Sequence, residues 1–169
     1  MYDLNYSFEK CKELLDDLRI PYALNTSIAA TDKELFGDLG LTRKKDNKSF
    51  LILINKLLLS GRLPEEMLER TIIHELLHTC AGCWDHGSEW REYAKIVNNN
   101  TDYALCTTCT SEEAELFDKA YAQTTGKKLY TVRCVNGDYS RSYIRRCSVV
   151  NHPEEYKCPC CGADLFHDK

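Results

Sequence analysis

The segment His74-Glu75-Leu76-Leu77-His78 limits what this chain can fold into more than any other part of the sequence. On a helix, residues four positions apart lie on the same face, with β-carbons about 5–6 Å apart. The rings of His74 and His78 can therefore reach one metal ion at the roughly 2.0–2.1 Å typical of a zinc–nitrogen bond. His86 follows after a short turn and offers a third ligand. Glu75 is suitably placed to hydrogen-bond a water on the metal and act as a general base.

The residues around this segment predict a buried helix. Large apolar side chains surround the polar ones: Ile72, Ile73, Leu76 and Leu77. A helix that is apolar on nearly all sides is buried, and buried polar groups need partners, which a metal ion would supply. The alternative is an amphipathic helix whose histidines are hydrogen-bonded core residues. The third histidine favours a metal site with three protein ligands and an open fourth position, as in catalytic zinc sites.

The flanking residues narrow the class further. Metzincins need a shorter spacing to the third histidine and a downstream methionine, but Met1 and Met67 both lie upstream. The run HELLHTCAGCWDHGSEW resembles the SprT-like (SprT/Spartan-type) family of zinc metalloproteases, in which HExxH is followed by a short turn, a His-Gly pair and an aromatic residue on the next helix. The corresponding residues here are His86, Gly87 and Trp90. The resemblance extends to apolar strands upstream and a cysteine ribbon at the C-terminus.

This resemblance implies a fold, an activity and a cofactor. The expected fold is α+β: a zincin-like domain over residues 1–126, with a small twisted β-sheet and the HExxH helix, then a small basic zinc ribbon over residues 127–169. The expected activity is zinc-dependent endoproteolysis of protein substrates, including proteins bound or crosslinked to DNA. The catalytic zinc would be held by His74, His78 and His86, with Glu75 as the base. The sequence singles out no residue to stabilise the oxyanion and leaves the oligomeric state open.

Composition predicts a cytoplasmic protein without a membrane partner. With 169 residues, 43% of them hydrophobic, the chain can bury one core plus a small appendage. Its first residues lack the apolar stretch of a signal peptide. The longest purely apolar run, Phe50–Ile54, is far shorter than a membrane span. Ten cysteines without an export signal favour metal ligands and reduced thiols over disulfides.

Charge is unevenly distributed along the chain. Residues 127–169 contain eight Lys/Arg and five Asp/Glu, a net charge of +3, whereas residues 1–126 contain 14 and 21, a net charge of −7. A basic tail suits DNA or RNA, and the alternative is a solvated surface. The candidate contacts are the basic residues Lys127, Lys128, Arg133, Arg141, Arg145 and Arg146, with Tyr130, Tyr139 and Tyr143 as stacking surfaces.

Four cysteines of the tail are expected to bind a structural zinc: Cys134, Cys147, Cys158 and Cys161. Cys158–Gly162 contains a C-x-x-C-G turn, whose glycine allows the chain to fold under the metal. The matching turn that begins at Cys134 has Gly137 where a second cysteine is expected. Cys147 is therefore only the first choice for the fourth ligand. His152, Cys160 and a ribbon without metal are the alternatives.

Two further C-x-x-C pairs are Cys80 with Cys83 and Cys106 with Cys109. They can form a second structural zinc site that fixes the loop before His86, a redox disulfide, or free thiols.

Hydrophobic periodicity predicts the secondary structure around these sites. Helices are predicted over residues 4–19, 64–79, 88–98 and 111–121, the last with Thr110 as N-cap and Glu113 completing a capping box. Strands are predicted over residues 22–29, 39–42 and 49–55, the last two joined by the turn 43–48. The strand containing Phe50–Ile54 is expected to be buried on both faces, and either offers backbone groups to an extended substrate or belongs to the core.

Two other classes of function stay open. One is a nucleic-acid-binding zinc module whose zincin domain is idle or regulatory, although an idle site has no need of Glu75. The other is a structural or redox adaptor built on the ten cysteines. Its activity would follow thiol state rather than Glu75.

Overall fold

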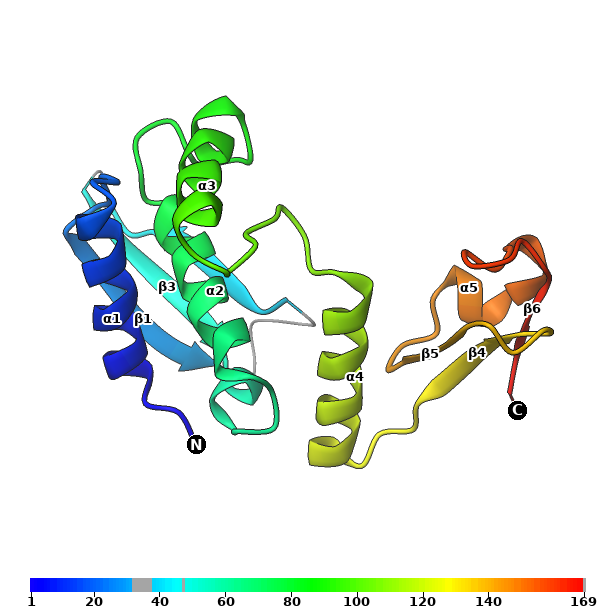
Figure 1. Ribbon diagram of the computed structural model, residues 1–169. Coiled ribbons are helices and arrows are strands. Elements are labelled where there is room, and N and C mark those ends of the chain that lie inside the picture. The colour runs from blue at the N-terminus through cyan, green and yellow to red at the C-terminus, as the bar shows by residue number, and fades with distance from the viewer. Residues whose placement is uncertain (32–37, 47, 169) are drawn as a thin grey trace. The chain divides into compact units, whose positions relative to one another are not determined.

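The computed structural model of the protein describes residues 1–31, 38–46 and 48–168. Within these residues the fold is mixed α+β, with two three-stranded sheets and five α-helices. The chain divides into two compact units, Met1–Thr108 and Cys109–Lys169 (Figure 1). Among the described helices, none is both long and apolar enough to cross a membrane.

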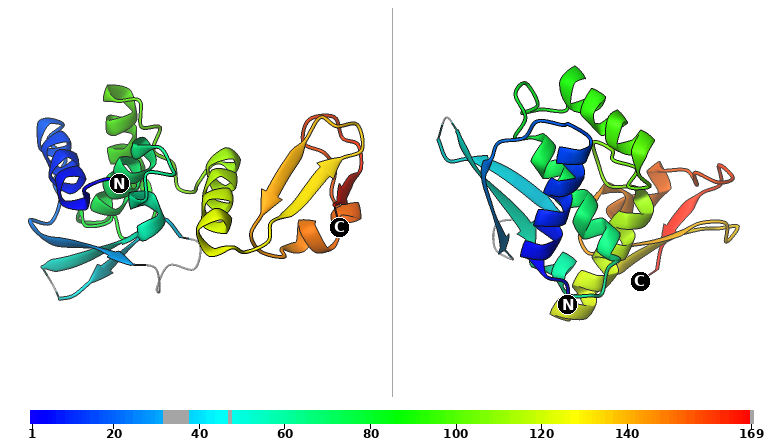
Figure 2. Two further views of the ribbon diagram at one scale, coloured as in Figure 1. Left: turned by 90° about the horizontal axis from the view of Figure 1, so that it is seen from below. Right: turned by 60° about the vertical axis from the view of Figure 1, so that its left-hand side comes forward.

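The first unit is built on a sheet with the strand order β1-β3-β2. Strand β1 (Asn25–Thr31) runs parallel to β3 (Ser49–Asn55), and β2 (Gly40–Lys44) runs antiparallel to it. Because β3 lies in the middle, β2 is an edge strand. The α-helices of this unit lie on one face of the sheet (Figure 2).

These helices are α1 (Leu4–Asp17), α2 (Glu65–Leu77) and α3 (Ser88–Asn100), and a short 3-10 helix, η1 (Lys56–Leu59), follows β3. Helix α1 begins at Asp3, whose carboxylate accepts the N–H groups of Asn5 and Tyr6. Helix α2 forms the centre of the unit, because its apolar residues from Met67 to Leu77 are buried. The apolar neighbours of the HExxH motif thus belong to a core helix, as predicted.

Most of the predicted elements are confirmed, with ends shifted by a few residues: the helices over 4–19, 64–79, 88–98 and 111–121, and the hairpin of 39–42 with 49–55. Residue 47 of the predicted turn lies outside the described residues. The strand predicted to begin at residue 22 begins at Asn25, because Ala23 is engaged by the hydroxyls of Thr79 and Thr26. Pro64 caps α2 instead of being its first helical residue.

Strand β3 only partly matches its predicted burial. Residues Ile52–Ile54 are buried, whereas Phe50 and Leu51 are half-buried. Since β3 is hydrogen-bonded to strands on both sides, it is a core strand, which is the second of the two alternatives left open by the sequence, and its backbone is not free to bind a substrate. Of the two edge strands, β2 lies next to α2 and β1 lies next to α1.

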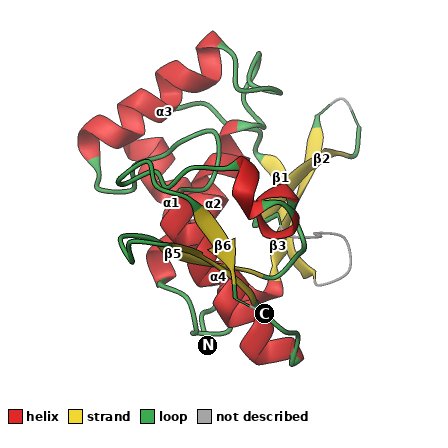
Figure 3. Ribbon diagram, turned by 90° about the vertical axis from the view of Figure 1, so that its right-hand side faces the viewer, coloured by secondary structure: helices red, strands yellow, loops and turns green. Residues whose placement is uncertain are grey.

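The second unit holds the other small sheet, with the order β5-β4-β6. Its elements are α4 (Ser111–Thr125), β4 (Tyr130–Cys134), β5 (Ser140–Tyr143), α5 (Ser148–Asn151), the 3-10 helix η2 (Pro153–Glu155) and β6 (Leu165–His167). Strand β4 is antiparallel to both neighbours, and the outer strands β5 and β6 are labelled in Figure 3. A small buried cluster holds the sheet to α5 and the C-terminal turn: Val132, Cys134, Val150, Cys158 and Leu165.

Helix α4 belongs to this second unit. The predicted capping box is present, since Thr110 and Glu113 each bond the backbone of the other. The carboxylate of Asp118 accepts the N–H of Ile144, just after β5. The division therefore falls after Thr108 and differs from the predicted boundary between residues 126 and 127. Local sequence pattern identified the helix but not the sheet against which it packs.

Candidate active site and metal centres

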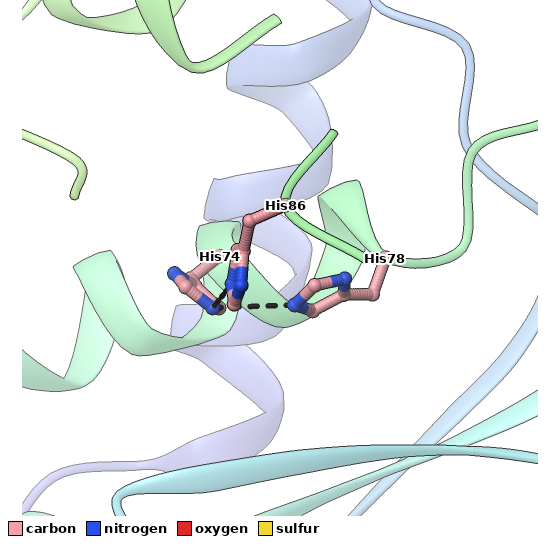
Figure 4. Close-up of side chains that lie close together, drawn as sticks. All are labelled: His74, His78 and His86. Carbon is pink, nitrogen blue, oxygen red and sulfur yellow. Dashed lines mark hydrogen bonds between the residues drawn. The ribbon is translucent and has the colours of Figure 1, made fainter. Parts of the chain in front are cut away.

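Three histidines of the first unit converge on one point and form what we call the three-histidine site: His74, His78 and His86. Helix α2 carries His74 within its last turn, and His78 caps its C-terminal end. The Nε2 atom of His74 lies 3.3 Å from Nε2 of His78 and 3.0 Å from Nε2 of His86 (Figure 4). The three rings are half-buried. This arrangement can hold one metal ion.

Backbone carbonyls hold two of these rings in place. Nδ1 of His78 lies 2.8 Å from the carbonyl oxygen of Cys83, and His74 hydrogen-bonds the backbone of Cys106. A carbonyl oxygen only accepts, so Nδ1 of His78 must carry the proton and Nε2 keeps its lone pair. Metal-binding histidines commonly have such an outer partner, which fixes the ring and its tautomer.

Burial keeps these histidines neutral. It lowers the pKa of His74 to about 3, with a further contribution from the nearby His78 and His86. Burial also lowers the pKa of His78. Neutral imidazole is the form that binds a metal, so no proton has to be displaced from these two rings near neutral pH.

The indole of Trp90 packs against all three rings. Trp90 lies on α3 and is 1% exposed. Its ring centroid is 4.8 Å from that of His74, 5.9 Å from His78 and 4.7 Å from His86. The aromatic residue that the sequence pattern placed after the third histidine is thus the packing support of the three-histidine site.

Glu75 is buried between α2 and the edge strand β2. Burial raises its pKa to about 7, and hydrogen bonds from Thr42 partly oppose this rise. The Thr42 hydroxyl lies 2.8 Å from Oε2 of Glu75 and 2.9 Å from its backbone carbonyl oxygen. A carboxyl group with a pKa near the working pH is suited to take up and release a proton. No sequence pattern points to Thr42, because its contact with Glu75 depends on how β2 packs against α2.

Three cysteines of the second unit form a second group, the three-cysteine site: Cys134, Cys158 and Cys161. The sulfur atoms of Cys134 and Cys161 lie 3.5 Å apart. Two turns closed by glycines shape the site, with the N–H of Gly137 donating to Cys134 and that of Gly162 to Cys158. Both glycines have positive φ, of 80° and 73°, a conformation that is costly for other residues.

Backbone donors also point at these sulfurs. The N–H of Asn136 lies 3.3 Å from the Cys134 sulfur, and the N–H of Cys160 lies 3.4 Å from the Cys158 sulfur. Such donors favour the thiolate, which is the metal-binding form of cysteine. The three-cysteine site can therefore also hold a metal ion.

The predicted fourth ligand, Cys147, is not part of this group. It is half-buried beside the small core and caps α5. Cys160 also stays outside the group, and His152 belongs to a separate exposed cluster with Glu154 and Glu155. The fourth ligand therefore stays a prediction.

The second structural zinc site was predicted at the other two C-x-x-C pairs, and three of its four cysteines lie in the first unit. Cys80 and Cys83 are buried, and the Cys80 thiol donates to the carbonyl oxygen of Pro21. Cys106 is exposed. Among the described residues of the first unit, these three cysteines form no metal-binding group. Cys109 lies in the second unit, so a site of all four stays a prediction.

Several of the basic side chains predicted to contact nucleic acid interact with aromatic or acidic residues of the second unit itself. Arg141 lies over the ring of Tyr143, Arg146 over Tyr130 and Lys127 over Tyr121, at 4.8–5.2 Å from the ring centroids. Arg133 forms an ion pair with Asp168. The acidic residues of α4 also offset the positive charge of the tail, because residues 109–169 contain nine Lys/Arg and nine Asp/Glu.

Comparison with known proteins adds no relative: no family model, no curated protein and no solved structure matches this chain.

Proposed function

We propose that the protein is a zinc-dependent endopeptidase of the SprT-like type, which cleaves protein substrates. The observation that carries this proposal is the convergence of three histidine rings on one point, with Nε2–Nε2 distances of 3.0 and 3.3 Å, beside a helix whose next residue after His74 is the buried Glu75. Three imidazoles form the protein donor set of a catalytic zinc centre, and a carboxyl group beside them in the sequence can serve as the general base.

The three-histidine site fits zinc. Ligand atoms about 2.0–2.1 Å from a tetrahedral zinc ion lie about 3.3 Å from one another. The Nε2 atom of His74 lies 3.3 Å from that of His78 and 3.0 Å from that of His86, close to this value. His74 and His78 are neutral at pH 7. Three protein ligands leave a fourth position for water or substrate.

When bound, zinc supplies a water with a pKa of about 7 and polarises the substrate carbonyl group. Glu75 then accepts a proton from the attacking water at its carboxylate and passes it to the leaving nitrogen of the cleaved peptide bond.

We propose that an extended substrate adds to the edge of β2. This strand lies at the outside of its sheet, next to α2. Backbone hydrogen bonds to an edge strand bind a peptide with little dependence on its side chains, which suits a protease that accepts different proteins.

The decisive experiment is Glu75→Gln. The variant should keep its zinc content, but its rate of cleavage of an unfolded protein substrate should fall by at least about 100-fold, as expected for loss of a general base. Glu66→Gln makes the same change on the exposed side of α2 and should leave the rate unchanged. Full cleavage by Glu75→Gln would overturn the proposal. Activity that follows thiol oxidation but not Glu75 would point to the redox adaptor instead.

We further propose that the three-cysteine site holds a structural zinc ion, so that the chain binds about two zinc ions in total. Three thiolates in reach of one point form a typical zinc donor set, completed by a fourth ligand. This ion takes no part in the reaction.

Nucleic-acid binding by the second unit is a second candidate function, and it would bring the protease to proteins on DNA. It is favoured by four exposed basic side chains: Lys127, Lys128, Arg145 and Arg146. Reversing the charge of Lys128 and Arg145 should flatten the salt dependence of single-stranded DNA binding by about one unit of slope per lost phosphate contact. Charge reversal of Arg91 and Lys95 in the first unit is the control. Absence of salt-dependent binding by the wild type at low ionic strength would exclude this function.

A further inference from the structure

The carboxyl group of Glu75 lies against two residues of β2. Gly40 and Thr42 are two positions apart on this strand, so both face α2, and they pair with Ile54 and Ile52 of β3. The Thr42 hydroxyl contacts Oε2 of Glu75 at 2.8 Å, and the Thr42 backbone also hydrogen-bonds this carboxyl group. The edge strand therefore contacts the proposed general base directly.

Gly40 leaves the space that the Glu75 side chain occupies. A β-carbon at this position would lie 2.8 Å from Cγ of Glu75 and 2.9 Å from Oε1. Its φ is not among the positive values of the chain, so the requirement for glycine here is one of space. Together, Gly40 and Thr42 form a cradle for the carboxyl group.

We propose that Thr42 is a positioning residue for Glu75: its hydroxyl holds the carboxyl group at the three-histidine site throughout the reaction. This inference rests on the proposed peptidase function and deepens it. In this role the Thr42 hydroxyl acts through Glu75.

The hydroxyl of Thr42 has two acceptors within reach. It carries one hydrogen and two lone pairs, and it lies 2.9 Å from the Glu75 carbonyl oxygen as well as 2.8 Å from Oε2. When Glu75 is a carboxylate, the hydroxyl donates to Oε2. When Glu75 has taken the proton of the water on its other carboxyl oxygen, Oε2 is still an acceptor, so the Thr42 hydroxyl keeps its hydrogen bond to it. One residue thus satisfies the carboxyl group before and after proton transfer.

Such a partner matters because Glu75 is buried. A buried carboxyl group without hydrogen-bond partners is costly and would turn toward solvent or toward another donor. A shift of a catalytic group by about 1 Å can lower a rate by about 100-fold. The hydroxyl therefore limits the positions that the base can take.

The test compares substitutions that remove or keep the hydroxyl. Thr42→Val keeps shape and backbone N–H but loses the hydroxyl, and we expect kcat to fall about 10- to 100-fold with KM and zinc content unchanged. Thr42→Ala should behave in the same way and guards against misfolding of the valine variant. Thr42→Ser keeps the hydroxyl and should stay within about threefold of the wild-type kcat. Ser7→Ala is the matched control and should leave kcat unchanged, because Ser7 is a buried residue of α1 whose hydroxyl donates to the Asp3 carbonyl oxygen.

The outcomes separate this inference from the proposed function. Cleavage that depends on Glu75 but proceeds at the wild-type kcat in Thr42→Val would overturn the role of Thr42 alone. Equal losses in the serine and valine variants would also overturn it, since packing would then be the cause. If the wild type shows no Glu75-dependent cleavage, the peptidase function fails. A crystal structure of Thr42→Val then still decides the positioning, because an unmoved Glu75 carboxyl group would contradict it.

Discussion

The three-histidine site and the three-cysteine site are built in opposite ways. His74 and His78 lie on a helix whose neighbouring residues Ile72, Ile73, Leu76 and Leu77 are fully buried. The cysteines lie on two tight turns, and Cys134 and Cys158 are themselves two of the five buried residues of their cluster. One site is attached to a core, while the other makes up much of the core.

This difference predicts how each site responds to loss of its metal. The first unit buries a large apolar core, and the three histidines lie at half-buried positions outside it. This unit should therefore stay folded without zinc. The cluster of the second unit is too small to supply much stability of its own. For such small sites the free energy of metal binding is largely free energy of folding.

The largest expected effect comes from the three-cysteine site. Substituting Cys158 and Cys161 by Ser should lower the zinc content by about one ion per chain and unfold the sheet of the second unit. The three-histidine site should keep its zinc. Elemental analysis measures the first effect, and amide dispersion in NMR spectra of the full chain measures the second. Cys160→Ser is the control, because Cys160 lies between the two ligands in sequence but outside the group. An unchanged zinc count in the double variant would exclude this metal site.

The sequence predicted the three-histidine site better than the three-cysteine site for a physical reason. Helical periodicity alone brings His74 and His78 together, and a glycine-containing turn returns the chain to His86. In the second unit the spacing predicts three ligands, but the cysteine expected at Gly137 is missing, and the fourth ligand depends on tertiary packing. The contacts of Thr42 and of the Cys106 backbone were not predictable, because they join segments that are distant in sequence.

The next largest effect is a change with pH in the unfolding free energy of the first unit without zinc. It can be measured only if this unit folds without metal. The pKa of Glu75 rises from 4.5 to about 7 on folding, so the folded state binds more protons than the unfolded state between these values. Its contribution to stability is therefore full below pH 4.5 and is lost as the pH rises through 7. The loss amounts to about 3 kcal/mol, an order-of-magnitude value.

Glu75→Gln removes this dependence and serves as the reference. In chelator-treated protein, the unfolding free energy of the wild type should fall relative to that of Glu75→Gln between pH 4.5 and pH 7.5. The depressed pKa of His74 acts in the opposite direction, since its contribution is lost as the pH falls below 6.5, but it is present in both proteins and cancels in the difference. Urea denaturation at both pH values provides the measurement. Parallel pH profiles for the two proteins would show that Glu75 is not held in its buried position.

The smallest effect probes the polar network that holds the first unit around the three-histidine site. The hydroxyl of Tyr103 donates to the buried carboxylate of Glu69 at 2.7 Å, and Lys10 pairs with the same carboxylate. Tyr103 lies three residues before Cys106, whose backbone hydrogen-bonds His74. Tyr103→Phe should lower the unfolding free energy by about 1–2 kcal/mol, the cost of losing a donor to a buried charged group. Zinc affinity at the three-histidine site should fall by less than about tenfold, because the side chain of Asn98 still holds Leu105 through two hydrogen bonds.

The control is Tyr22→Phe, which removes a similar but exposed hydrogen bond to Asp16. This variant should lower the unfolding free energy by less than about 0.5 kcal/mol. Equal losses in the two variants, measured by urea denaturation, would show that burial of the Tyr103–Glu69 hydrogen bond adds nothing to the stability of the first unit.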